Sequence, residues 1–147
     1  NSEDLARAEA IIDREIPRLS QLVNYAVSLE PSQRNALGRS ETYALQYLGL
    51  MTGLKNSIAL FRAIEGRPDR EELLSKLPAG LSISYAQNVY PMLYLDGYEL
   101  DELIQARDRS RGQTKEMFNV AVSLLELHNA AGVDPLLTTK AWRNLVN

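Results

Sequence analysis

Apolar residues recur every three or four positions along most of this chain, which is the spacing that places them on one face of an α-helix. The clearest stretch, residues 40–65, has no proline. Its regularly spaced apolar side chains are Ala44, Tyr47, Leu48, Met51, Leu54, Ile58, Phe61 and Ile64. This pattern predicts one long amphipathic helix. A buried helix of that length acts as a scaffold and indicates an all-α fold.

Hydrophobic spacing, proline and glycine divide the rest of the chain into further helices. Pro17 is expected to bend the first of them, because an interior proline removes a backbone hydrogen bond. Residues 81–85 alternate like a strand, but no second strand-like run exists to pair with them. We therefore favour a helix there, kinked or divided at Pro91. The predicted helices span about 2–29, 31–38, 40–65, 70–77, 84 onward, 96–110, 114–131 and 135–146.

Short polar side chains stand at several of these helix starts. Ser40, Asp69 and Thr114 are predicted N-caps, and Asp96 with Glu99 has the spacing of a capping box.

No linker or internal repeat divides the chain. The sequence therefore predicts a single compact all-α domain, residues 1–147, built as a bundle of about seven or eight helices. Residues 40–65 and 114–131 are expected to be its two long central helices.

Composition narrows the function classes. The 147 residues are 45% apolar and 24% charged, which suits a globular chain that folds without disulfides or metal. The absence of cysteine excludes thiol catalysis, cysteine-ligated zinc and iron–sulfur clusters, and it fits a cytoplasmic location. No run of 18 apolar residues exists, so no membrane span is expected. Because the chain begins at Asn1 and not at Met, we expect a processed product or a piece of a longer protein.

The net charge of −3 argues against a nucleic-acid partner. The densest basic cluster consists of Arg107, Arg109, Arg111 and Lys115. It precedes a predicted helix start, where an anion could bind, but it does not match a phosphate loop. We expect a solvated turn and keep the cluster as a candidate contact for an anion or a partner.

His128 is the only histidine, and no oriented acid or base partner is evident for it. We expect it near the end of a helix, where a partial positive charge is favourable, and expect exchange for glutamine to cost little. The sequence thus predicts no catalytic residue, no metal site and no cofactor.

Tyrosines cluster in one proline-broken segment. The candidate binding residues are Tyr85, Tyr90, Met92, Tyr94 and Tyr98. Tyrosine combines apolar area with a polar tip and is enriched at binding surfaces. The alternative is that these rings pack on the long helix.

Gly49 and Gly53 lie one turn apart inside the long helix, where glycine is unfavourable. Their positions predict the close approach of a second segment of the same chain.

Together these features favour a non-enzymatic helical module for protein–protein interaction or regulation. Its partner would be another protein or a self-associating subunit. The alternative is a sensor domain that binds a small apolar ligand in a pocket between helices. An enclosed cavity would favour the sensor, and an exposed apolar patch would favour the interaction module.

Overall fold

The computed structural model describes residues 2–77, 88–95 and 97–136, and in that part of the chain all regular structure is helical. Its elements are α1 (Ser2–Ser28), α2 (Pro31–Ala36), α3 (Ser40–Ile64), α4 (Arg70–Ser75), the π-helix η1 (Pro91–Leu95), α6 (Leu100–Arg109) and α7 (Gly112–Ala131). Residues 88–90 are helical and lead directly into η1. The predicted all-α bundle of about seven helices is confirmed.

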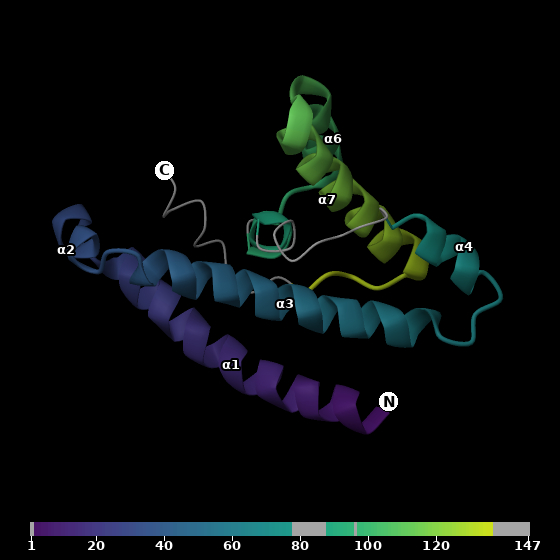
Figure 1. The fold of residues 1–147 in the computed structure, drawn as a ribbon, viewed down its shortest axis with the longest axis horizontal. Coiled ribbons are helices and arrows are strands. Elements are labelled where there is room, and N and C mark those ends of the chain that lie inside the picture. Colours follow the sequence, from purple (N-terminus) through teal and green to yellow (C-terminus); the bar gives the residue numbers. More distant parts are fainter. Residues whose placement is uncertain (1, 78–87, 96, 137–147) are drawn as a thin grey trace.

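The two long helices α1 and α3 lie side by side in opposite directions, with α2 at the turn between them (Figure 1). Ion pairs that join Lys55 to Asp13 and Arg62 to Glu9 fix their register. The buried side chains between them are Leu19, Val23, Leu45 and Leu48, which also contact Leu95. This hairpin forms one layer of the molecule.

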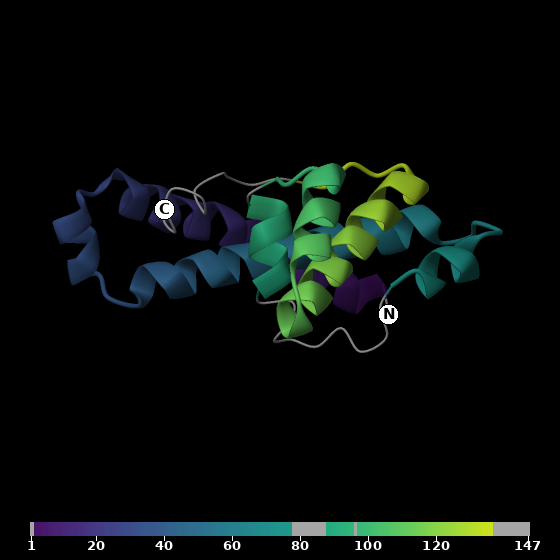
Figure 2. The same cartoon turned by 90° about the horizontal axis from the view of Figure 1, so that it is seen from above.

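A second hairpin, formed by α6 and α7, packs over the opposite side of α3, with η1 in the centre (Figures 1 and 2). The core shared by these elements contains Val89, Leu93, Tyr94, Leu103, Val120, Ala121, Val122, Leu124 and Leu125. Of the two long helices predicted to be central, α3 therefore contacts both layers, and α7 supplies much of the second core.

Gly49 and Gly53 mark the place where η1 reaches α3. A Cβ atom at Gly53 would lie 2.1 Å from Cδ2 of Tyr90, and one at Gly49 would lie 2.4 Å from Cγ of Pro91. Only glycine leaves room for those two side chains. The predicted close approach at this pair is confirmed, and the approaching segment begins at Tyr90.

Two predicted N-caps are wrong. Ser40 is the first residue of α3, which follows Arg39, and Thr114 lies inside α7, which begins at Gly112. Asp69 stands at the N-cap position of α4 as predicted, but its side chain makes no capping bond, because both of its carboxylate oxygens accept hydrogen bonds from Arg67 at 3.0 Å.

The capping box before α6 lies three residues later than predicted. Glu99 and Glu102 form it, and the backbone N–H of Glu99 donates to the carboxylate of Glu102 at 3.1 Å. The predicted partner, Asp96, lies outside the described residues.

Asn56 ties the end of the described chain to α3. Its buried amide accepts a hydrogen bond from the backbone N–H of Leu136 at 2.7 Å and donates to the Leu136 carbonyl at 3.0 Å. Residues 133–136 are not helical. Most of the predicted last helix, 137–146, lies outside the described residues.

Candidate interaction face and apolar pocket

The tyrosine-rich segment lies mostly inside the protein. Tyr90 and Tyr94 are buried, Met92 and Tyr98 are half-buried against the same core, and Tyr85 lies outside the described residues. Burial at Tyr90 and Tyr94 favours the packing alternative for their rings. A binding role for the segment stays a prediction.

His128 and Tyr94 form a buried polar pair between α7 and η1. The His128 side chain is 1% exposed, and its Nε2 lies 3.0 Å from the Tyr94 hydroxyl. Its Nδ1 lies 3.0 Å from the carbonyl oxygen of Val133. Because a carbonyl can only accept, Nδ1 carries the proton, and Nε2 accepts the hydrogen bond from Tyr94.

This environment corrects the charge expected for His128. Burial lowers its pKa, although the hydrogen bond to Val133 and the charge of Asp134 act in the opposite direction. Burial also raises the pKa of Tyr94 far above its ordinary value. The histidine is therefore a neutral core residue, and the helix end does not stabilise a positive charge on it.

Folded stability is expected to fall as the pH drops below about 6.5, because unfolded His128 takes up a proton there and the folded form resists it. Above that pH His128 is neutral in both the folded and the unfolded protein, so it does not contribute to the pH dependence of stability. One proton limits the slope to about 1.4 kcal/mol per pH unit. Urea unfolding at a series of pH values measures it.

His128→Gln is the matched control for this titration, because the chain has no other histidine. The variant should lose the slope between about pH 6.5 and pH 5, above the range in which most carboxylates titrate. Identical slopes in the two proteins would contradict a buried neutral histidine.

The basic cluster lies at the turn between α6 and α7. Arg109, Arg111 and Lys115 are exposed, and Arg107 is half-buried with its Nε 3.3 Å from a carboxylate oxygen of Asp108. The structure thus gathers the four cations at one hairpin tip. Their contact with an anion or a partner stays a prediction.

A seam of mostly exposed, mostly apolar side chains runs along α3. Leu50 in this seam also packs against the core of the second layer, and Ser57 and Phe61 line the pocket described next. The seam consists of Tyr43, Tyr47, Leu50, Leu54, Ser57 and Phe61, spaced alternately four and three residues apart. Tyr43, Tyr47, Leu54 and Phe61 keep 52%, 56%, 39% and 51% of their surface exposed. This is the spacing with which one helix packs on another in a coiled coil. Such exposure of large apolar side chains in a row is typical of an interaction site.

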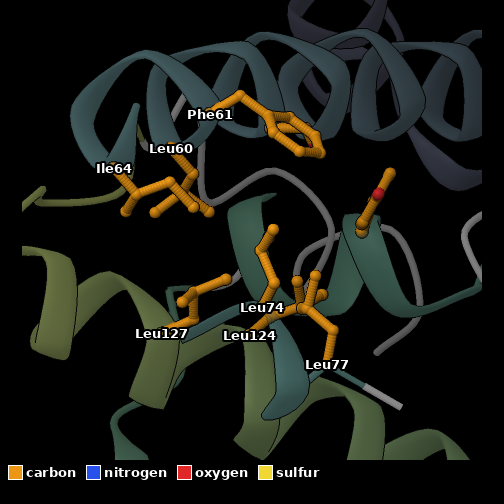
Figure 3. A pocket seen from close by; sticks show the side chains of 9 residues that line it. Leu60, Phe61, Ile64, Leu74, Leu77, Leu124 and Leu127 are labelled. Carbon is orange, nitrogen blue, oxygen red and sulfur yellow. The ribbon is translucent and has the colours of Figure 1, made fainter. Parts of the chain in front are cut away.

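A pocket of about 240 Å³ lies between α3, α4 and α7. Figure 3 shows Leu60, Phe61 and Ile64 on one side of it and Leu74, Leu77, Leu124 and Leu127 on the other. Ser57 and Tyr90 also line it, and none of these nine described lining residues is charged.

The described residues hold no group of three or more acidic or histidine side chains that could bind a metal ion. None of their helices combines the length and apolar character needed to cross a membrane. Comparison with known protein families, curated proteins and solved structures gives no match.

Proposed function

We propose that the chain is a protein–protein interaction module and that the seam on α3 is its contact face. The observation that supports this is a row of half-exposed aromatic and aliphatic side chains with coiled-coil spacing. At about 1.5 Å per residue, the seam from Tyr43 to Phe61 is about 27 Å long, enough to dock one amphipathic helix.

The seam fits a second copy of this chain. Its spacing reads the same in both directions, so an antiparallel α3 would bring Tyr43 opposite Phe61 and Leu50 opposite Leu54. Such a contact is isologous and closes as a dimer. The six seam residues carry no charge that would repel a second copy or require an oppositely charged partner.

The α1 helix carries two further exposed apolar side chains at the level of one end of the seam. The ion-paired register of α1 and α3 places Leu22 at the level of Tyr47 and Tyr25 at the level of Tyr43. Leu22 and Tyr25 are 46% and 58% exposed. Tyrosine is enriched in the centres of interfaces, which supports an association through this end of the hairpin.

A non-catalytic role is part of this proposal. Both ring nitrogens of His128 are engaged in hydrogen bonds inside the core, which leaves no free histidine to act as a base. A cytoplasmic location, proposed on the lack of cysteine, is compatible with such a module.

Leu54→Glu is expected to abolish self-association, because it places a charge at the centre of the seam. Sedimentation equilibrium from about 1 to 200 µM should show a concentration-dependent dimer for the wild type and a monomer for the variant. The dissociation constant of the dimer should rise at least tenfold, since an unpaired charge would be buried in the contact. The variant should keep its stability, because Leu54 is 39% exposed in the monomer.

Asn119→Glu adds the same charge at an exposed position of α7 and is the matched control. It should dimerise as the wild type does. A wild type that stays monomeric at every concentration would overturn self-association, and the helix of a different protein would then be the seam's remaining occupant. Equal dimerisation of wild type and Leu54→Glu would exclude the seam.

A further inference from the structure

The pocket between α3, α4 and α7 shares Ser57 and Phe61 with the seam, but it carries an inference of its own. We infer that it binds an uncharged, mostly hydrocarbon small molecule that bears one hydrogen-bonding group, which meets the Tyr90 hydroxyl. This adds a ligand-binding function to the proposed interaction module.

The side chains that line the pocket indicate that most of the ligand is apolar. Seven of the nine lining residues are Leu60, Phe61, Ile64, Leu74, Leu77, Leu124 and Leu127, which offer no polar side-chain atom. The volume of about 240 Å³ exceeds the ~150 Å³ of an apolar cavity that holds benzene. A medium-length alkyl chain or a substituted ring fits that space.

Access to the pocket lies beside Phe61. This side chain is 51% exposed and lines the pocket, whereas Leu60, Ile64 and Leu127 deeper in the pocket are 4%, 1% and 1% exposed. Figure 3 shows the Phe61 ring lying between α3 and the leucines of the opposite wall. A ligand entering there would bury its hydrocarbon part against the inner leucines.

The Tyr90 hydroxyl indicates that the ligand carries one hydrogen-bonding group. Its side chain is 6% exposed and lines the pocket, and the described residues provide no hydrogen-bond partner for its hydroxyl. The hydroxyl is not among the buried unpaired polar atoms of the described residues, so it is accessible, and an accessible hydroxyl in an apolar pocket can bond a ligand oxygen. A ligand hydroxyl, carbonyl or ether oxygen at this position would satisfy it.

Gly53 and the core hold this hydroxyl in place. The Tyr90 ring lies against the bare backbone of Gly53 and 5.6 Å, centre to centre, from the ring of Tyr94. The ring is therefore fixed by packing on both sides, and no bond of its hydroxyl is needed to orient it. A preorganised polar group in an apolar pocket is the arrangement that gives small-molecule sites their orientation.

The described lining residues carry no charge, which disfavours a charged ligand. An ionised carboxylate or ammonium group in this pocket would lose its hydration without gaining an oppositely charged partner. Ser57 does not change this, because its hydroxyl already donates to the Gly53 carbonyl at 2.9 Å. Uncharged alcohols, phenols, ketones and esters are the chemical classes that this lining favours.

The test compares 1-octanol with octanoate, which have the same chain length and differ in charge. Titration of each into the full chain, with leucine methyl groups labelled for NMR, should give saturable shifts for 1-octanol centred on Leu60, Leu74, Leu77, Leu124 and Leu127. Octanoate should bind at least tenfold more weakly. Equal affinities, or shifts that spread over leucines remote from the pocket, would overturn the inference.

Tyr90→Phe separates the hydrogen bond from the pocket. Removing a hydroxyl without a partner should leave the unfolding midpoint unchanged or higher, and it should weaken 1-octanol binding about fivefold. Binding of toluene, which has no polar group, should not change. Unchanged 1-octanol affinity in this variant would overturn the role of Tyr90.

Leu77→Trp at the edge of the pocket is the second variant. The larger side chain should fill the space and abolish binding of both probes, while circular dichroism reports an unchanged helical fold. Undiminished binding would place the probes elsewhere. The seam variant Leu54→Glu should bind 1-octanol normally, so failure of the seam and failure of the pocket can be told apart.

Discussion

Gly53→Leu is expected to lower the free energy of unfolding by about 1–3 kcal/mol, the usual cost of overpacking a filled core. Even the first carbon of the new side chain would lie 2.1 Å from the Tyr90 ring. Leucine has the better helix propensity by up to about 1 kcal/mol, which opposes this cost. The packing term is the larger one, because the Tyr90 ring lies directly against the Gly53 backbone and packs beside Tyr94 in the core.

Urea unfolding of the two proteins measures this difference, and Thr42→Leu is its matched control. Thr42 is exposed on the same helix, so the leucine there gains propensity without a clash, and stability should change by less than about 0.5 kcal/mol. Equal midpoints for the wild type and Gly53→Leu would mean that the Tyr90 ring does not lie against α3 at this point.

The sequence predicted the helices well because each long one carries an unbroken apolar period. In α3 that period, together with glycines at 49 and 53, also predicted where another segment comes close. The helix starts were predicted less well. At α4 the predicted N-cap position of Asp69 is right, but its carboxylate binds the neighbouring Arg67 and not the helix end. A local cap signal cannot account for such a competing partner.

The seam and the buried pair could not be read from the sequence for different reasons. Tyr43, Tyr47 and Leu54 show the spacing of the seam, but α3 is apolar on several sides, and only packing decides which side stays exposed. The partner of His128, Tyr94, is 34 positions away in the sequence, and no local pattern joins the two. The density of tyrosine indicated a binding surface, whereas the Tyr90 ring fills the space that Gly53 leaves beside α3 and the Tyr94 ring packs next to it in the core.

His128→Leu is expected to cost about 2–4 kcal/mol, because it removes both hydrogen bonds of the ring and fills its place with an apolar side chain. The Tyr94 hydroxyl, on a residue that is 0% exposed, would lose its acceptor, and the Val133 carbonyl would lose its donor. His128→Gln should cost less, since its amide can still offer one donor and one acceptor. The small cost expected for exchange to glutamine therefore does not extend to an apolar replacement.

A double-mutant cycle that combines His128→Leu with Tyr94→Phe measures how much of this lost stability comes from the contact between the two side chains. Tyr94→Phe alone removes the donor and leaves Nε2 of His128 unpaired, whereas in the double variant no hydroxyl remains to be satisfied. The double variant should therefore lose about 1–2 kcal/mol less than the sum of the single losses. Additive losses would mean that the two side chains do not share a bond. If His128→Leu instead unfolded at the wild-type midpoint, water would have to reach both polar groups, and the core between α7 and η1 would be more open than its buried residues indicate.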